Sequence, residues 1–169
     1  MISSPCCGIA PGATSGGEVL ERETLLALRR LGHAPHVLLA YGKRYPGELD
    51  DCIESTWPHR GQRWPVQALT LPFYLRRCRS RHGRPDVYRA HTILGLGQAC
   101  LWAGRTYGRP VVMHFTHFDA GDRWRRLRAH LLRQADRVVT ISEFSRWQLL
   151  GLGIDPGRIR VVPCGVGPE

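Results

Sequence analysis

Short runs of apolar residues alternate with amphipathic segments along most of the chain. The first helix is predicted over residues 18–31, where apolar positions recur at helical spacing, and Gly32 ends it. These positions are Leu20, Ala27, Leu28 and Leu31. Further strands are predicted over residues 36–40, 86–90, 111–115, 137–141 and 158–162, and further helices over 71–81, 93–106, 122–135 and 143–150. Ser142 is expected to cap the last helix.

Two segments do not follow this alternation. Only three residues precede Ser4 and Pro5, fewer than an ordinary strand needs. We therefore expect that the first strand is truncated or, as the favoured alternative, that the true start lies upstream of Met1. Residues 41–68 lack periodicity and are rich in Pro, Gly and Trp. They are predicted to form a long irregular excursion, which in compact domains is often functional or mobile.

The pattern as a whole predicts an α/β fold, in which helices sandwich a mostly parallel, Rossmann-like sheet. The length of 169 residues is that of one domain. No apolar run approaches the length needed to cross a bilayer, and the N-terminus has no secretory pattern. A cytoplasmic location is expected.

The chain is strongly basic, with a formal net charge of +10 that comes almost entirely from arginine. A basic surface attracts anions such as lipid headgroups, sugar nucleotides or nucleic acid, although no nucleic-acid-binding motif is present. A GC-rich genome explains the arginine excess equally well.

The six cysteines of the chain form no CxxC pair, and none is recognised at zinc-ligand spacing with a histidine. They are expected to be reduced structural thiols, and no metal site is predicted. No Ser/His/Asp triad is visible either.

Five segments resemble the N-terminal domain of glycosyltransferase family 4 (GT-B fold), in the order and spacing of that family. They are SGGEV leading into LRRLGH (15–33), PDVYRAH (85–91), GRPVV (108–112), ADRVVTISEFSR (135–146) and GIDPGRIRVVPCGV (153–166). Three positions depart from the family pattern. The glycine loop lacks the alanine of GGAE, Arg89 replaces the first histidine of HAH, and Cys164 replaces the asparagine of PNGV.

The resemblance implies the acceptor-side half of a two-domain retaining glycosyltransferase, which moves a sugar from a nucleotide-sugar to an acceptor hydroxyl. Residues 1–163 would form this domain, and residues 164–169 would begin the interdomain hinge. The donor-binding domain, with its ExxxxxxxE segment, is not seen. We therefore expect no turnover from this polypeptide alone, which could be a fragment, a frameshifted product or a subunit that needs a separate donor-binding partner. The nucleotide-sugar is a substrate, and neither cofactor nor metal is expected.

Gly16 and Gly17 are the candidate residues for the donor phosphate. Backbone N–H groups and the helix dipole at a helix N-terminus favour an anion, and missing Cβ atoms allow close approach. An ordinary tight turn is the alternative. His91 follows a predicted parallel strand at the sheet edge where ligands bind in such folds, and is a candidate cleft residue. A simple helix-start residue is the alternative there.

The resemblance also places one histidine after the strand 111–115, near the reacting sugar. A direct count lands on Thr116, but His117 is the predicted catalytic residue because it lies beyond the strand end. His114 lies within the strand and is predicted to be a core or edge residue. Asp119 is a further cleft candidate, with a turn residue as its alternative.

Two arginine clusters flank these segments, at residues 76–84 and 123–133. Arg123, Arg126 and Arg133 are predicted to bind an anionic membrane, because each cation near such a surface contributes about 1 kcal/mol. A solvated helix face is the alternative. The competing function is accordingly a non-catalytic anion- or membrane-binding module. A nicotinamide-binding Rossmann domain is disfavoured, since GxGxxG is absent after the first strand.

Overall fold

The structure, a computed structural model, describes residues 1–6, 16–40, 47–56, 64–118 and 121–164. Its strands form a single parallel sheet in the order β3-β2-β1-β4-β5-β6-β7. The strands are β1 (Ile2–Cys6), β2 (Pro35–Ala40), β3 (Ile53–Thr56), β4 (Val87–Ala90), β5 (Val111–Phe115), β6 (Arg137–Thr140) and β7 (Ile159–Val161). The predicted Rossmann-like α/β architecture is confirmed. The direction of winding reverses between β1 and β4, which makes that position the topological switch point.

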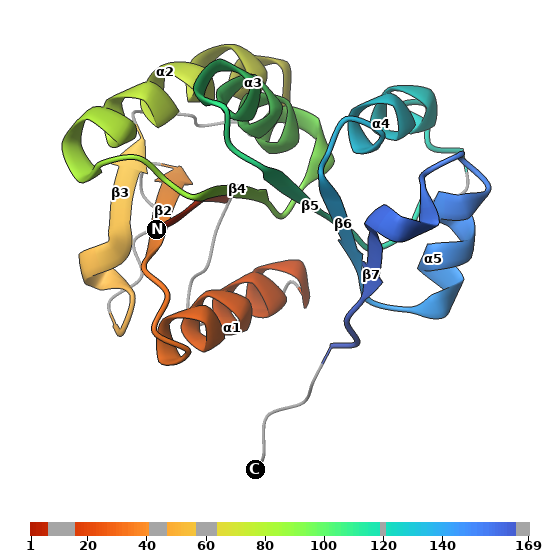
Figure 1. Cartoon of the computed structure of the whole chain (residues 1–169), viewed down its shortest axis with the longest axis horizontal. Helices are drawn as coiled ribbons and strands as arrows, with labels where there is room; N and C mark the ends of the chain where they lie inside the picture. Colours follow the sequence, from red (N-terminus) through yellow and green to blue (C-terminus); the bar gives the residue numbers. More distant parts are fainter. Residues whose placement is uncertain (7–15, 41–46, 57–63, 119–120, 165–169) are drawn as a thin grey trace.

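Helices cover both faces of this sheet. Figure 1 shows α1 on one face and α2, α3 and α4 on the other, with α5 beside β7. The helices are α1 (Gly16–Arg30), α2 (Trp64–His82), α3 (Gln98–Tyr107), α4 (Arg125–Leu132) and α5 (Glu143–Leu150). Two 3₁₀ turns (Asp50–Cys52, Pro156–Arg158) and a π-type turn (Ile93–Gly97) complete the described elements.

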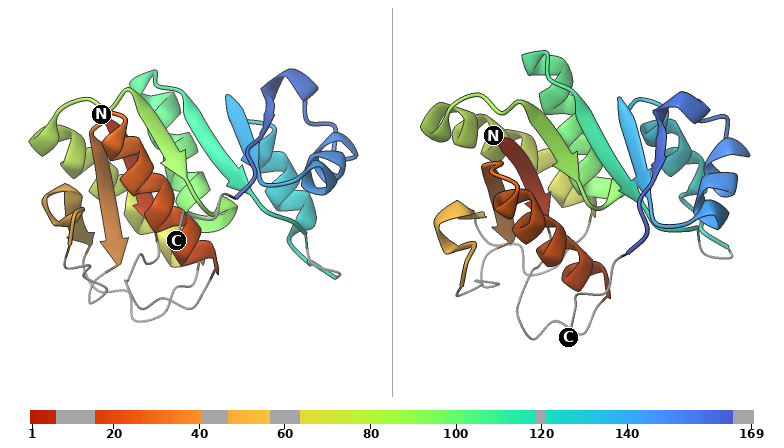
Figure 2. Two further views of the ribbon diagram at one scale, coloured as in Figure 1. Left: turned by 90° about the horizontal axis from the view of Figure 1, so that it is seen from below. Right: turned by 60° about the horizontal axis from the view of Figure 1, so that its bottom comes forward.

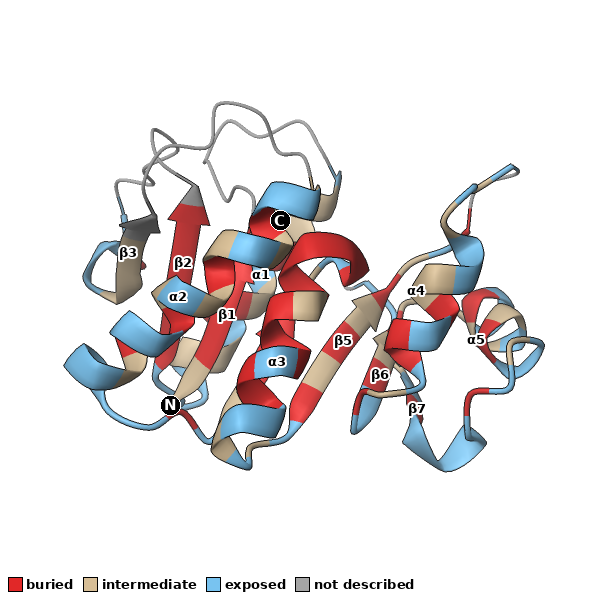
Figure 3. Cartoon of the chain, turned by 90° about the horizontal axis from the view of Figure 1, so that it is seen from above, coloured by how far each residue is buried: buried red, intermediate tan, exposed pale blue. Residues whose placement is uncertain are grey.

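The two faces bury separate cores of unequal size. The larger core joins α2, α3, α4 and α5 to the sheet, with Tyr88, Met113 and Leu132 at its centre. The smaller core lies under α1 and includes Leu25 and Val37. In Figure 3 buried residues follow β1 and β2 and the sheet-facing side of α3, and buried and intermediate residues alternate along β5. The alternation of side chains along β2 divides that strand between the two cores.

The expectation of a truncated first strand is wrong. β1 has five residues and pairs with β2 along its whole length, from Ile2 to Cys6. On its other side it pairs with β4 only at Ile2 and Ser3. Pro5, which suggested a break, lies beyond the last residue paired with β4. Its missing N–H therefore removes no bond from that ladder.

The buried face of α1 differs from the predicted one. The buried residues are Glu21, Leu25 and Leu26, while Leu31 is 74% exposed. The predicted stripe residues Leu20, Ala27 and Leu28 instead line a trough between α1 and the sheet. Periodicity identified the helix but assigned the core to the more apolar face, whereas the buried face includes the charged Glu21.

Residues 41–68 are more regular than predicted. They include the edge strand β3 and the first turn of α2, while residues 41–46 and 57–63 lie outside the described residues. The helix predicted over 71–81 begins seven residues earlier, at Trp64, and contains Pro72. Its buried positions are Gln67, Leu71, Leu75 and Cys78, a helical stripe that a polar residue and a proline obscured.

The segment predicted as one helix over 93–106 is interrupted near its start. Gly95 has a φ of +73° within the turn before α3. A Cβ at this position would come within 2.3 Å of Gln67 Oε1, so α2 packs directly on the glycine backbone. The helix predicted over 122–135 is shorter than expected and spans Arg125–Leu132.

The strand-to-helix turn before α5 forms as the sequence predicts. Ser142 has extended backbone angles, and its hydroxyl oxygen accepts a hydrogen bond from the Ser145 N–H at 3.1 Å. This satisfies one of the N–H groups that a helix start leaves without an intrahelical partner. Among the described residues, no helix is both long and apolar enough to cross a membrane.

Candidate functional site

A cavity of about 400 Å³ opens where β4 and β5 end and α1 begins. Its lining includes four residues singled out from the sequence: Gly17, His91, Thr116 and His117. They come from three segments that are far apart in the chain. The cavity adjoins the switch point between β1 and β4, the edge at which open α/β sheets bind ligands.

Gly17 belongs to the first turn of α1, which starts at Gly16. The N–H groups of a first turn have no intrahelical acceptor, and the helix dipole adds partial positive charge there. An anion in the cavity would therefore meet backbone donors at this end. Gly16 is exposed and is not part of the cavity lining.

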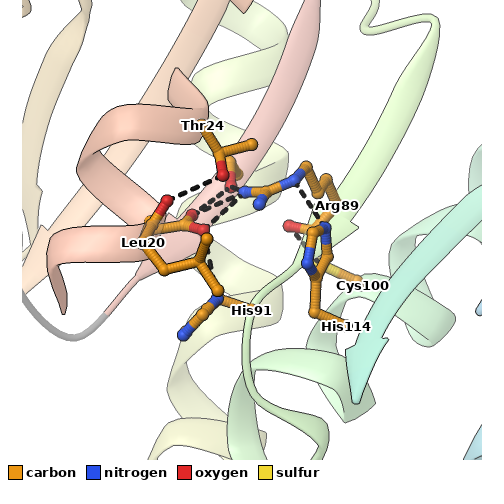
Figure 4. A network of polar contacts seen from close by, with 8 residues as sticks. Leu20, Thr24, Arg89, His91, Cys100 and His114 are labelled. Atoms are coloured by element: carbon orange, nitrogen blue, oxygen red, sulfur yellow. Dashed lines mark hydrogen bonds and ion pairs between the residues drawn. The ribbon is translucent and has the colours of Figure 1, made fainter. Parts of the chain in front are cut away.

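A buried network of polar side chains contacts two histidines of the cavity lining, His91 and His114 (Figure 4). Arg89 of β4 places Nη1 2.7 Å from both carboxylate oxygens of Glu21 on α1. The Ser4 hydroxyl of β1 donates to Glu21 Oε1 at 3.1 Å. Two strands and a helix thus meet at one carboxylate.

The network also orients two histidines. His91 Nδ1 lies 3.2 Å from Glu21 Oε2. Arg89 Nε donates to His114 Nε2 at 3.0 Å, and the rings of His91 and His114 are 5.9 Å apart. Because His114 Nε2 accepts from a guanidinium, it carries no proton. His114 lines the cavity as well, so its predicted role as only a core or edge residue is incomplete.

The ionisation states follow from burial and charge. Burial alone would raise the pKa of the Glu21 carboxyl, but Arg89 and His91 outweigh it and lower this pKa to about 2. Burial, with Arg89 next to it, lowers the pKa of His114 to about 3. At neutral pH the site therefore holds a carboxylate, a guanidinium and a neutral His114.

Arg128 of α4 lines the same cavity, although the sequence did not suggest it. Its Nη1 lies 3.2 Å from Asp122 Oδ2, and its buried Nε has no hydrogen-bond partner among the described residues. Arg128 thus brings a guanidinium to the cavity wall, a group that suits a phosphate oxygen.

The remaining predicted site residues lie elsewhere. Asp119 is outside the described residues. Arg123 and Arg126 are exposed on and beside α4, and the Arg123 guanidinium stacks over the Trp124 ring. Arg133 is also exposed, but its guanidinium donates twice to the Leu152 carbonyl, at 3.0 and 2.7 Å, so it ties α4 to the turn after α5.

Sequence reasoning missed Ser4, Glu21 and Arg89 as site residues. The signal for Arg89 was its place where the resembling family has histidine. The signal for Glu21 was an acidic residue four positions after Gly17, one helical turn before Leu25. Only the sheet order brings these two side chains together.

A second, larger cavity of about 600 Å³ borders the site. It is an apolar trough between α1 and the face formed by β4, β5 and β6, with Val112, Val139 and Ile141 among its lining residues. Figure 2 shows α1 as the one described helix on this face of the sheet. Arg89 and His114 lie where the trough meets the network.

The family model for Glycosyltransferase Family 4 matches residues 14–169. The chain belongs to this family. No curated protein sequence matches it significantly. The comparison confirms the resemblance that the five sequence segments indicated.

Solved structures share the fold at low sequence identity. A glycosyltransferase from Rickettsia africae superimposes with a TM-score of 0.70 at 19% identity, over 98% of this chain and 43% of that chain. HepE from Anabaena, in complex with UDP and glucose, superimposes with a TM-score of 0.65 at 16% identity, over 98% of this chain and 44% of that chain. A putative UDP-N-acetylglucosamine 2-epimerase from Listeria monocytogenes superimposes with a TM-score of 0.65 at 16% identity, over 94% of this chain and 43% of that chain. The family 4 chain thus spans less than half the length of these structures.

Proposed function

We propose that this family 4 chain is the acceptor-side half of a retaining glycosyltransferase and that it faces a nucleotide-sugar across the cavity at the switch point. The observation that carries the proposal is the meeting of Gly17, His91 and His117 at one cavity. The family membership and the UDP and glucose in the Anabaena neighbour support a nucleotide-sugar as the donor.

The residues of the cavity have different roles, which follow from the chemistry of their side chains and backbone. The first turn of α1 at Gly17 and the Arg128 guanidinium stabilise the negative charge of the diphosphate as it departs. His91, held by Glu21, offers its other ring nitrogen to a phosphate or a sugar hydroxyl. His117 lies at the mouth, where it contacts the acceptor or the reacting sugar. The acceptor oxygen bonds to the anomeric carbon, and the bond from that carbon to the diphosphate oxygen breaks.

Catalysis rests mainly on positioning, so a second lobe that holds the nucleotide is needed. The proposal therefore includes the absence of turnover by residues 1–169 alone. The donor-binding lobe would be a further segment or a separate subunit.

A chimera tests this proposal. Residues 1–163 are joined to the donor-binding half of the Rickettsia africae relative and supplied with labelled UDP-, GDP- and ADP-sugars and a panel of hydroxyl acceptors. We expect labelled product from the chimera, a loss of about 10²-fold or more in His117→Ala, and no loss in His130→Ala, an exposed histidine on α4. A folded, donor-binding chimera that releases or transfers no sugar would refute the proposal.

A second function, docking on an anionic membrane, is supported by α2. Val66, Leu69 and Phe73 are exposed on this helix at helical spacing, by 41%, 81% and 66%. Exposed arginines follow at Arg76 and Arg77. An apolar stripe next to cations is the pattern of a helix that lies in a lipid interface.

Cosedimentation with liposomes tests this docking. We expect binding to vesicles with anionic lipid, weaker binding in Leu69→Ser with Phe73→Ser, and little binding to neutral vesicles or at high salt. Retention of full binding by the double variant would place the contact elsewhere, for example on Arg123 and Arg126.

A further inference from the structure

Two histidines and a glutamate meet near the amino-terminal ends of β2 and β3, away from the cavity described above. They are His36 of β2, Glu54 of β3 and His82 at the end of α2. One ligand-type atom from each lies within 4.8 Å of the other two. Glu54 Oε2 is 3.7 Å from His36 Nε2 and 3.4 Å from His82 Nε2. Ligand atoms about 2.0–2.1 Å from a tetrahedral ion are separated by about 3.3–3.4 Å, close to these values.

The two oxygens of Glu54 have different neighbours. Oε1 faces the arginines of α2, with Arg77 Nε at 3.8 Å and Arg81 Nη1 at 3.4 Å. Oε2 faces both histidines and accepts a hydrogen bond from the Cys78 thiol at 3.1 Å. The arginines therefore fix the carboxylate from one side and leave the other oxygen directed at the two imidazoles.

His36 is buried without a hydrogen bond that would justify its burial. Its side chain is 8% exposed, and its Nδ1 has no hydrogen-bond partner among the described residues. Its Nε2 comes no closer than 3.7 Å to Glu54, which is longer than a hydrogen bond. Nε2, the atom that faces Glu54 Oε2 across this distance, is the one placed to share an ion with the carboxylate.

We propose that His36, Glu54 and His82 bind a divalent transition-metal ion of the zinc class. Two imidazoles and one carboxylate leave a fourth position for water, and such donor sets suit zinc or cobalt better than magnesium or calcium. Cys78 acts on Glu54 through the hydrogen bond that its thiol donates to Oε2. The chain thus carries a metal site that its cysteine spacing did not reveal.

The ion can reach this position from solvent. His82 is 46% exposed. A cavity of about 430 Å³ borders both histidines, and its wall includes Asp51 and Cys52. The arginines near Oε1 are about half exposed, so water screens their repulsion of the ion.

The site joins the end of α2 to the edge strand β3 and to its neighbour β2. A bound ion would therefore stabilise this edge of the sheet, and it would do so independently of sugar transfer at the opposite strand ends. At an ion concentration of about 100 times Kd, mass action raises the thermal midpoint by roughly 5–10 °C for a chain of this size.

The test is a titration of the chelator-treated, reduced chain with Zn²⁺ and with Co²⁺, followed by calorimetry, thermal unfolding and the Co²⁺ spectrum. We expect one equivalent bound, a higher thermal midpoint, and visible d–d bands of a four- or five-coordinate Co²⁺ without a sulfur charge-transfer band. His82→Ala, at a half-exposed position that tolerates substitution, lowers the affinity at least about tenfold and reduces the shift in midpoint to about half or less. His130→Ala keeps both.

Three results would overturn the proposal. They are no binding of either ion by the folded chain, equal affinity in His82→Ala, or an intense sulfur-to-cobalt band, which would place the ion on cysteine thiolates. Glu54→Gln provides a second variant that keeps the shape of the side chain. Unchanged affinity in a folded Glu54→Gln would also refute the assignment.

Discussion

Arg89 Nη1 lies 2.7 Å from both carboxylate oxygens of Glu21, and the two side chains expose only 6% and 1% of their surface. This pair connects β4, in the middle of the sheet, to α1, which begins at the cavity. Arg89 occupies the position at which the family 4 pattern HAH has its first histidine. Arg89 therefore supports the site from within the sheet.

Replacing Arg89 with alanine should destabilise the fold severely. The change leaves the Glu21 carboxylate buried without its main partner, which costs about 3–5 kcal/mol. Urea denaturation of Arg89→Ala checks this value. Arg126→Ala, at an exposed position on α4, should stay within about 0.5 kcal/mol of the parent.

The pair should also show strong coupling. When Glu21→Met and Arg89→Met are combined, no buried charge remains, so the double variant should lose less stability than the sum of the two single variants by at least about 1 kcal/mol. Additive losses of stability in this cycle would mean that Glu21 and Arg89 are solvated separately. The short distances between them would then contribute no interaction free energy.

Stability should fall as the pH is lowered below neutrality. Burial lowers the pKa of His114 from 6.5 to about 3, so the unfolded chain takes up a proton below pH 6.5 that the folded chain refuses. The slope reaches about 1.4 kcal/mol per pH unit for one such group. His36, whose pKa is also lowered by burial, adds to the same slope. Below pH 4.5 the Glu21 carboxyl adds a further loss of stability. Its pKa is lowered from 4.5 to about 2 in the folded chain, so the unfolded chain takes up this proton first.

The histidine part of this loss can be isolated. Urea denaturation of the parent and of His114→Asn at a series of pH values between 7 and 5 compares the two slopes. The slope should be smaller in His114→Asn and unchanged in His130→Asn. An identical slope in His114→Asn would show that this imidazole titrates normally in the folded chain.

Replacing either of two glycines with alanine should have opposite effects on the stability of the fold, although both have ordinary backbone angles. A Cβ on Gly104 in α3 would lie 2.4 Å from Val111 Cγ2 and 2.8 Å from the Arg109 carbonyl oxygen. Gly104→Ala should therefore lose about 1–3 kcal/mol by overpacking, despite the better helix propensity of alanine. At Gly151 the nearest atoms are 3.5 Å away, so Gly151→Ala should be neutral or slightly stabilising. Thermal unfolding of both variants measures the contrast.

Local patterns in the sequence were sufficient for much of the sheet. The strand at Val111–Phe115 and the helix at Glu143–Leu150, with its Ser142 cap, have the predicted bounds. In both cases the signal is local: an apolar run after Gly-Arg-Pro, and a capping serine before a helical stripe. The edge strand β3 was missed because its sequence, IEST, is short and has only one apolar residue.

The candidate site was only partly predictable. Gly17, His91 and His117 each follow a strand or begin a helix, so their common edge follows from a parallel sheet. The ion pair of Glu21 with Arg89 depends instead on which strands are neighbours and which face of α1 is buried. The same is true of His36 and His82, which are 46 positions apart in the chain. No local pattern contains that information.

The most direct test of the proposed diphosphate contacts in the cavity is a nuclear magnetic resonance titration of the labelled chain with UDP, GDP and ADP, carried to high concentration because the second lobe would supply the other nucleotide contacts. The account predicts saturable shifts of the Gly17 amide and of the His91 and His117 imidazoles along one binding curve, with weaker binding in Arg128→Ala and displacement by pyrophosphate. Shifts confined to the exposed arginines of α4, or the same binding curve in Arg128→Ala, would contradict it.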